Sequence, residues 1–265
     1  MRIEHIGDAT LHLGDCLKIM PDIPDKSIDM VLCDLPYGTT ACKWDVIIPF
    51  EPLWEQYKRI IKDNGVIVLF GSQPFTSTLV MSNIKMFKYE WIWVKDKGAN
   101  FASCKKTPMK IHENILVFGG GKYFPQMKER PKNNMRNNKP RINKSSQTGT
   151  EWLCENSKGN LPVKYPESVL NYNACREYLH PTQKPVALCE YLIKTYTNEG
   201  ETVLDNCMGS GTTGVACANL NRKFIGIELE EKYFDIACKR IETAYSQPRL
   251  FDETQVKDIQ NKFEL

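Results

Sequence analysis

Val31-Leu32-Cys33-Asp34-Leu35-Pro36-Tyr37-Gly38 closes an apolar run that begins at Ile28. The run is rich in β-forming residues and predicts a short buried strand. The proline holds Leu35 in an extended conformation, so the strand end carries a carboxylate, an oriented backbone carbonyl and an aromatic plane. Ligands bind at this edge of open α/β sheets, and these groups suit a flat heterocycle with an exocyclic amine. The alternative without a functional role is an ordinary strand end followed by a Pro-Tyr turn.

Length and composition are those of a globular protein. At 265 residues, with 42% hydrophobic and 25% charged residues, the chain suits one α/β domain with an insertion. No apolar run reaches 18 residues and the N-terminus lacks a signal-peptide pattern, so a cytoplasmic protein without a membrane span is expected. The ten cysteines include no Cys-x-x-Cys pair. Buried free thiols explain them better than a metal site or disulfides, and no metal is assigned.

The charge distribution is uneven. Between Lys122 and Lys164 there are ten Lys/Arg against three Glu, a net charge of +7, whereas the whole chain carries +3 and the remainder therefore −4. A basic segment on a mildly acidic body indicates a polyanionic partner. A solvated loop is the alternative explanation of such a charge run.

Hydrophobic patterning predicts a doubly wound α/β fold with a mostly parallel seven-stranded sheet. The expected strands are 9–13, 28–33, 66–70, 89–94, 114–118, 202–204 and 224–227, and the expected helices are 51–62, 185–197, 212–220 and 230–245. A polar, Asn-rich region interrupts this alternation. We therefore expect a first half of the domain at 1–118, a basic irregular insertion at 119–173, a second half at 174–247 and a tail at 248–265.

A second candidate site follows the strand that ends at Leu204. Gly209, Gly211 and Gly214 match the G-x-G-x-x-G pattern between a strand and a helix, and Glu228 ends the next strand, where an acid accepts hydrogen bonds from ribose. A nucleoside-containing cofactor is favoured over a structural turn. Asp205 just before the turn would repel a pyrophosphate, but it would attract the ammonium and sulfonium of S-adenosylmethionine.

Several short motifs together resemble a known family. Asp34–Tyr37 resembles the catalytic Asp-Pro-Pro-Tyr motif of amino-group DNA methyltransferases, and Asp205–Thr213 resembles their Asp-Pro-Phe-x-Gly-Ser-Gly-Thr-Thr cofactor loop. The catalytic motif precedes the insertion and the cofactor loop follows it, which is similar to the β-class order. Gly14-Asp15 resembles the segment that meets the cofactor's adenine, and His180–Pro185 resembles the segment at its methionine end.

The resemblance implies a Rossmann-like methyltransferase fold and an S-adenosylmethionine-dependent DNA methyltransferase. The implied catalytic residues are Asp34, Leu35, Pro36 and Tyr37, and the implied cofactor-binding residues are Asp15, Thr182, Lys184, Asp205, Gly209, Gly211, Thr212 and Glu228. Double-stranded DNA is the implied partner, with a homodimer and a cognate restriction endonuclease as further candidates. An acid at position 34 favours adenine N6 over cytosine N4, the alternative target.

The chemistry expected at the first site follows from the electronic structure of an aromatic amine, whose lone pair is delocalised into the ring. Asp34 and the Leu35 carbonyl would accept its two N–H bonds and aim the lone pair at the methyl donor, while Tyr37 stacks on the base. Because the amine lies inside a duplex, the base must first be flipped out.

Basic and loop segments are expected to assist in binding DNA. The insertion is expected to recognise the target, with phosphate contacts from Lys105, Lys106 and Lys110 nearby. The loop 39–48, which contains Lys43, Trp44 and Asp45, is a candidate to close over the extruded base.

Two departures from the family pattern affect the site. Leu35 replaces the first proline of the catalytic motif, although the following proline still orients the Leu35 carbonyl. Asn206-Cys207 replaces Pro-Phe in the cofactor loop and removes an aromatic ring that would pack near the cofactor. The second departure makes cofactor affinity the property most open to change.

Other classes of function remain open from the sequence. A nicotinamide-dependent oxidoreductase would use the glycine turn but leaves Asp34–Tyr37 and the basic insertion unexplained. A DNA-binding protein without catalytic activity would have no need for the acid, proline and tyrosine together. Methylation of RNA or of protein amides is a third alternative.

Overall fold

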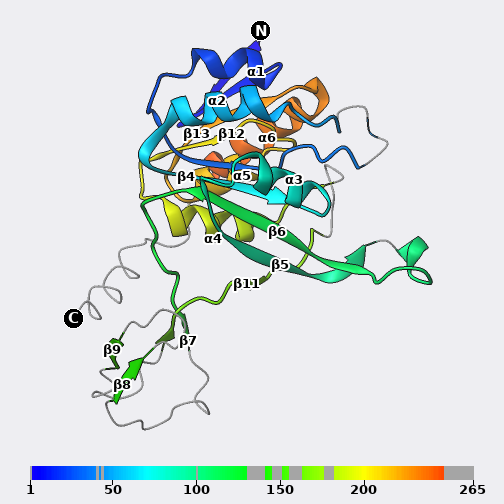
Figure 1. Cartoon of the computed structure of the whole chain (residues 1–265). Helices are drawn as coiled ribbons and strands as arrows, with labels where there is room; N and C mark the ends of the chain where they lie inside the picture. Colours follow the sequence, from blue (N-terminus) through cyan, green and yellow to red (C-terminus); the bar gives the residue numbers. More distant parts are fainter. Residues whose placement is uncertain are drawn as a thin grey trace. The chain divides into compact units, whose positions relative to one another are not determined.

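The computed structural model of the chain forms two compact units, which we describe separately. Met1–Phe124 with Ser168–Leu265 form the large unit, and Pro125–Glu167 form the small one (Figure 1). The residues that the structure describes are 2–39, 42, 45–99, 101–129, 141–144, 151–154, 163–175 and 182–247. The expected tail at 248–265 lies outside these residues.

In the described part of the large unit, nine strands form one mixed, mostly parallel sheet. Their order is β1 (Arg2–Ile6), β2 (Ala9–Leu13), β13 (Lys223–Glu228), β12 (Thr202–Asp205), β3 (Ile28–Cys33), β4 (Ile61–Gly71), β6 (Lys110–Gly119), β5 (Phe87–Ala99) and β11 (Val169–Asn171). The five neighbours from β2 to β4 run parallel. Strand β6 runs antiparallel to both β4 and β5.

The expectation of an α/β fold with a mostly parallel sheet is confirmed, but the predicted count of seven strands is wrong. All seven expected strands are in the sheet, and β1 and β11 are added at its two edges. Strand β1 is largely exposed and forms a hairpin with β2. Its sequence therefore has no apolar run from which a buried strand could be predicted. Strand β11 has three residues, of which only Leu170 is buried, and its pairing with β5 is long-range.

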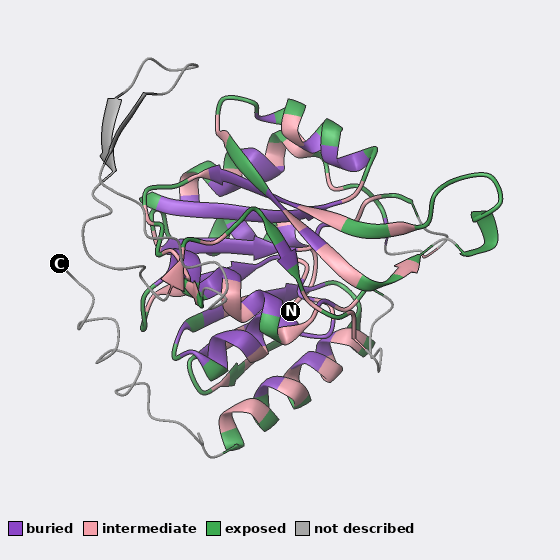
Figure 2. Cartoon of the chain, turned by 90° about the horizontal axis from the view of Figure 1, so that it is seen from below, coloured by how far each residue is buried: buried purple, intermediate pink, exposed green. Residues whose placement is uncertain are grey.

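Helices cover both faces of the sheet. On one face α4 (Val186–Tyr196), α5 (Thr212–Asn219) and α6 (Glu231–Ser246) pack against a core that includes Met30 and Leu32 of β3. On the other face α1 (Cys16–Ile19), α2 (Phe50–Ile60) and α3 (Phe75–Ser82) pack against Val31 and Cys33. Because alternate residues of β3 enter two different cores, its residues 30–33 must all be apolar. Asp29, near the start of the strand, is buried as well, but it pairs with Lys62 at 2.7 Å. Figure 2 shows these buried layers in purple.

Helices α1 and α3 are additions to the sequence prediction. Helix α1 has four residues, with Asp15 as its N-cap: the carboxylate accepts a hydrogen bond of 3.0 Å from the Leu17 amide. Helix α3 follows the Gly71–Pro74 turn and buries Phe75, Thr76 and Leu79. A one-turn helix is too short for a periodic pattern, which explains why α1 is missed.

The described part of the small unit contains two short antiparallel pairs. One joins β7 (Lys128–Glu129) to β10 (Val163–Lys164), and the other joins β8 (Arg141–Lys144) to β9 (Glu151–Cys154). The unit falls within the insertion expected at 119–173. Five of the basic residues counted there, at 130, 132, 136, 139 and 158, lie outside the described residues.

The sheet order determines where a ligand can bind. After β3 the chain continues to β4 on one side, whereas β12 leads to β13 on the other side, and β3 and β12 are neighbours. The helices that follow these two strands diverge, so a crevice opens at their carboxyl ends. Among the described helices, none combines the length and the apolar character needed to cross a bilayer.

Candidate active site

The two sequence motifs lie at the tips of adjacent parallel strands. Leu204 of β12 pairs with Val31 of β3, so the segments that follow them meet at one edge of the sheet. Together they line a single cavity. Eleven of the residues expected at the site line it: Asp15, Asp34, Leu35, Pro36, Tyr37, Thr182, Lys184, Asp205, Gly209, Thr212 and Glu228. The twelfth, Gly211, lies between two lining residues, Ser210 and Thr212, and shapes the turn.

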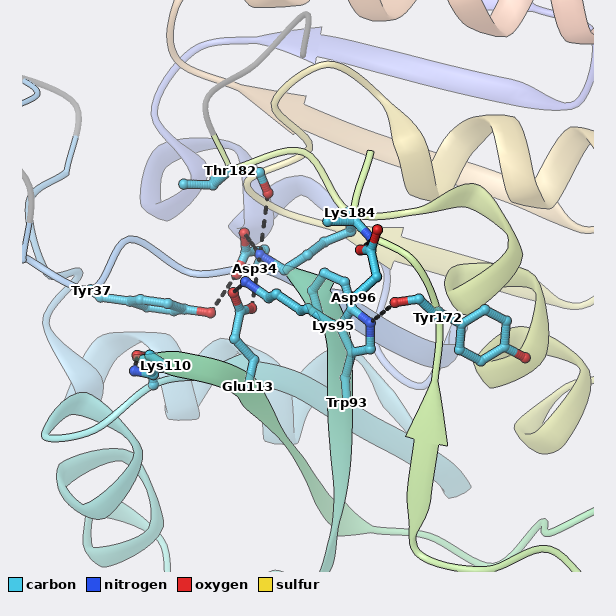
Figure 3. A network of polar contacts seen from close by, with 12 residues as sticks. Asp34, Tyr37, Trp93, Lys95, Asp96, Lys110, Glu113, Tyr172, Thr182 and Lys184 are labelled. Carbon is cyan, nitrogen blue, oxygen red and sulfur yellow. Dashed lines mark hydrogen bonds and ion pairs between the residues drawn. The ribbon is translucent and has the colours of Figure 1, made fainter. Parts of the chain in front are cut away.

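Asp34 is the centre of a polar network at the tip of β3 (Figure 3). One carboxylate oxygen accepts a hydrogen bond of 2.6 Å from the Tyr37 hydroxyl, and the other pairs with the ammonium of Lys184. Burial raises the pKa of Asp34, and Lys184 opposes this rise. Because each oxygen already has a partner, Asp34 is held in one orientation facing the cavity.

Lys184 connects Asp34 to a second acid. Its side chain is only 7% exposed, and its Nζ lies 3.4 Å from Oε2 of Glu113, which in turn pairs with Lys95. Burial lowers the pKa of Lys184, but the two carboxylates outweigh burial and leave that pKa raised. Lys184 was assigned to the cofactor by resemblance; here its ammonium bridges the acid of β3 and the acid of β6.

Glu113 is the site residue that the sequence analysis missed. It comes from β6, which runs antiparallel to β4, so its position at the carboxyl edge of β3 depends on long-range pairing. The available signal was an acid immediately before the strand expected at 114–118, whose residues 115–118 are apolar. A largely buried acid within a strand requires a partner, and Lys184 and Lys95 supply it.

A Glu113→Gln variant should lower kcat about tenfold, since a hydrogen bond to a charged group contributes roughly 1.5–3 kcal/mol. The charge of Glu113 raises the pKa of Asp34, so the acid limb of the kcat/KM profile should move to lower pH. Methyl-transfer kinetics from pH 5 to 9 measure both effects, with the exposed Glu51→Gln as control. A lower melting temperature with an unchanged pH profile would assign Glu113 a purely structural role.

The motif's remaining residues also have defined surroundings. The Leu35 side chain is buried in the core between the sheet and helices α1, α2 and α3. This burial explains how a leucine is accommodated where the family has proline. The Tyr37 ring stacks on Phe75 with centroids 4.9 Å apart; its stacking on a base stays a prediction. Asp45 accepts hydrogen bonds of 2.8 Å from the amides of Gly38 and Thr39. Lys43 and Trp44 of the expected closing loop lie outside the described residues.

The cofactor turn requires glycine at a defined position. Gly211 is the N-cap of α5 with φ of +77°, and a Cβ there would lie 2.8 Å from Cβ and 3.0 Å from Cα of Ala237. The preceding Gly209 donates its amide to Glu228 Oε2 at 2.8 Å. The Glu228 carbonyl accepts from the Gly14 amide at 2.8 Å. Glu228 therefore joins the glycine turn to the segment that carries Asp15.

A Gly211→Ala variant should lose about 2–3 kcal/mol of stability through its left-handed φ and the contact with Ala237. Gly200→Ala is the matched control, because Gly200 has φ of +76° and no atom within 4 Å of the added Cβ. That control should lose only about 1–2 kcal/mol. Urea unfolding of both variants measures the difference; equal losses would show that crowding at Gly211 has no cost.

Asp205 is buried at the tip of β12, where its carboxylate accepts hydrogen bonds from Thr213 Oγ1 at 2.7 Å and the Cys207 amide at 3.2 Å. Burial raises the pKa of Asp205 to about 7. The adjacent Asn206, which replaces a proline of the family pattern, is buried and accepts a hydrogen bond of 2.6 Å from the Tyr57 hydroxyl. This departure is thus compensated within the core.

The charge of the cavity selects the kind of ligand that fits it. Among the described residues, its lining has one cationic side chain, Lys184, and five carboxylates: Asp15, Asp34, Asp45, Asp205 and Glu228. Such a lining disfavours a pyrophosphate and favours an ammonium and a sulfonium. The residues present therefore fit S-adenosylmethionine.

Comparison with known proteins identifies the family. The family model described as DNA methylase, for N6 and N4 methyltransferases, matches residues 28–239. The chain belongs to this DNA methylase family. It is 28% identical to the Type II methyltransferase M.HpaI of Haemophilus parainfluenzae over 93% of this chain and 78% of that protein. It is also 28% identical to the DNA adenine methyltransferase YhdJ of Escherichia coli K12, over 89% and 83% of the two chains.

A solved structure extends this agreement to the cofactor. The methylase resembles the crystal structure of the M1.HpyAVI–SAM complex with a TM-score of 0.60 and 26% identity, over 88% of this chain and 99% of that one. The methylase is an S-adenosylmethionine-dependent enzyme, as the motifs predicted. A nicotinamide-dependent oxidoreductase is set aside by the family match.

Proposed function

We propose that this DNA methylase transfers a methyl group to N6 of an adenine flipped out of duplex DNA. The observation that carries the proposal is one cavity lined both by Asp34 at the tip of β3 and by the glycine turn after β12. At this position Asp34 can accept a hydrogen bond from the amine, and the glycine turn can bind the methyl donor. S-adenosylmethionine supplies an electrophilic methyl group when bound.

The residues of β3 prepare the amine. Asp34 and the Leu35 carbonyl accept its two N–H bonds, which draws the nitrogen towards sp³ and orients its lone pair. Pro36 fixes the direction of that carbonyl, and Tyr37 stacks on the base. Lys184 and Glu113 hold the Asp34 carboxylate in place. Orientation within a largely desolvated site supplies much of the acceleration.

The other residues of the cavity bind the donor. Glu228 binds the ribose hydroxyls, Asp15 the adenine, and Asp205 the cationic methionine end. Gly209, Gly211 and Thr212 form the turn against which the cofactor lies, and Thr182 contacts its methionine end. Each of these residues lines the cavity or, for Gly211, connects two that do.

Adenine is favoured over cytosine by the acid at position 34, because cytosine-N4 enzymes of the resembled family often carry serine there. A relative that covers most of the chain, YhdJ, is named a DNA adenine methyltransferase. Target recognition is assigned to the basic insertion 119–173. A homodimer and a cognate restriction endonuclease remain candidate partners.

One experiment tests the reaction and the target base together. The purified protein is incubated with unmethylated bacterial DNA and labelled S-adenosylmethionine, and the DNA is digested to nucleosides for mass spectrometry. We expect N6-methyladenine. N4-methylcytosine would show that the target base is cytosine and not adenine. Label in RNA or protein but not in DNA would overturn the proposal. Wild-type reactions without DNA provide the background.

A further inference from the structure

A lysine-rich arm projects from the large unit beside the candidate active site. We define the arm as residues 97–111, of which the structure describes all but Asn100. The arm joins the end of β5 to the start of β6 and contains the 3-10 helix η2 (Phe101–Ser103). Figures 1 and 2 both show it extending away from the body of the sheet. Its tip is ordered by backbone hydrogen bonds of 2.8 Å from Lys106 and 2.9 Å from Thr107 to the Ser103 carbonyl.

Strand register places the base of the arm at the edge of the sheet that carries the cavity. Gly71, the last residue of β4, pairs with Asn114 of β6, and Asn114 pairs with Ile92 of β5. Among the described strands, β5 and β6 pair beyond this point only with each other and with β11. From Asn114 the ladder continues over four residues of β6 to Lys110, which pairs with Ala99, roughly 13 Å further at about 3.3 Å per residue. Glu113 and Lys95, at the base, belong to the network around Asp34.

The arm has the charge of a polyanion-binding element. Its sequence contains four lysines and no acidic residue. Within the described part of the chain, no carboxylate pairs with Lys97, Lys105 or Lys106, and all three are exposed. Lys110, expected to contact phosphate, instead donates a hydrogen bond to Ser72 Oγ and is half-buried. Three lysines are thus available to a partner.

The arm also exposes apolar side chains. Phe101 at the tip is 76% exposed, and Met109 and Ile111 on the returning strand are 40% and 48% exposed. An aromatic ring displayed to this extent has no role in the core of the large unit. Apolar side chains that protrude among cations are the type that DNA-bending proteins insert between base pairs.

We propose that the arm binds the duplex beside the extruded adenine, with Lys97, Lys105 and Lys106 on phosphates and Phe101 inserted into the base stack. This inference rests on the proposed function and adds to it a device for base extrusion. The ladder beyond Asn114 extends roughly 13 Å even before the tip is added, which matches the width of the major groove, about 12 Å. The inserted ring replaces stacking that the flipped base gives up, which offsets part of an extrusion cost of a few kcal/mol.

The lysines are tested by the salt dependence of DNA binding. Fluorescence anisotropy with a labelled 30-base-pair duplex compares the wild type with Lys105→Gln/Lys106→Gln at 50–300 mM salt. If both lysines meet phosphates, the slope of log Kd against log salt should fall by about 1.8. Lys58→Gln/Lys223→Gln, with the same charge loss at exposed positions on α2 and at the amino end of β13, should leave the slope within about 0.3 of wild type.

Phe101 is tested by changing the cost of extrusion. The substrate is a duplex that contains the target site, identified beforehand by sequencing DNA that the enzyme has methylated. On this duplex Phe101→Ala should lower kcat/KM about tenfold. Opposite an abasic position the target base is already unpaired, so the variant should return to within about twofold of wild type. Ile3→Ala, an exposed apolar residue on β1 at the other edge of the sheet, is the control and should show neither effect.

The outcomes separate this inference from the proposed function. Unchanged salt slopes in the lysine variant, or an equal loss by Phe101→Ala on paired and unpaired targets, would overturn the role of the arm even if the enzyme methylates adenine. A wild type that binds DNA with the expected slope but does not methylate it would overturn the proposed function alone. If the lysine variant keeps its slope but changes its sedimentation coefficient, the arm contacts a second copy of the chain instead.

Discussion

Replacing Asp34 with alanine should reduce methyl transfer by about 100- to 1,000-fold, the loss typical of removing one preorganised polar group from an active site. Without the carboxylate, the amine loses the acceptor that orients its lone pair, so the effect should appear in kcat. The Kd for S-adenosylmethionine should stay within about threefold of wild type, since the cofactor turn is attached to β12. Single-turnover methylation and isothermal titration calorimetry measure the two quantities.

Folding of this variant must be followed in parallel, because Asp34 is a partner of buried Lys184. The ammonium keeps Glu113 at 3.4 Å, so we expect a lower melting temperature but a folded protein. Asp235→Ala, which removes an exposed carboxylate paired with Arg2, is the matched control and should retain full activity. Turnover by Asp34→Ala within tenfold of wild type would remove Asp34 from the catalytic role.

Replacing Asp205 with asparagine should weaken S-adenosylmethionine binding at pH 8 by about 10- to 100-fold, as expected for the loss of a buried charge-assisted contact. The pKa of Asp205 is raised to about 7 by burial, and a cationic ligand favours the ionised acid. Wild-type affinity should therefore be constant above pH 7 and fall about tenfold per pH unit below it. The variant should lack this pH dependence, so the two proteins converge near pH 5.5.

The raised pKa of Asp205 has the opposite effect on the folding stability of the free protein, which should fall as pH rises. Because burial raises the pKa of Asp205 in the folded state to about 7, the protonated acid stabilises the fold below its ordinary pKa near 4, and this contribution is lost as pH rises through about 7. Calorimetric titrations and thermal melts from pH 5 to 8.5 give both trends, with Asp63→Asn, an exposed acid, as control. A wild-type affinity that does not change between pH 5.5 and 8 would exclude Asp205 as the cationic contact.

Local patterning was sufficient for the central part of this fold. Residues 30–33 are apolar on both faces because β3 lies between two helical layers, and such a run predicts a buried strand. The glycine turn and Asp205 were recognisable because a strand, a tight turn and a helix follow one another within a few residues. Both motifs depend on interactions between sequence neighbours.

Edge strands and the second acid could not be found in this way. Strand β11 exists only because Val169–Asn171 pairs with Ile92–Val94, some 77 residues earlier in the chain. Glu113 reaches Lys184 only because β6 inserts antiparallel between β4 and β5. No local preference encodes either arrangement, since the partners lie far apart in sequence.

The sequence by itself determined the two strand tips, the order of the motifs and the cationic character of the ligand they suit. Only the tertiary structure decided that Lys184 bridges Asp34 and Glu113, and that a lysine-rich arm starts from the same edge of the sheet. The physical reason is the range of the interactions. Turns and buried strands are determined by residues that are neighbours in the sequence. Ion pairs and sheet edges instead depend on which distant segments pack together.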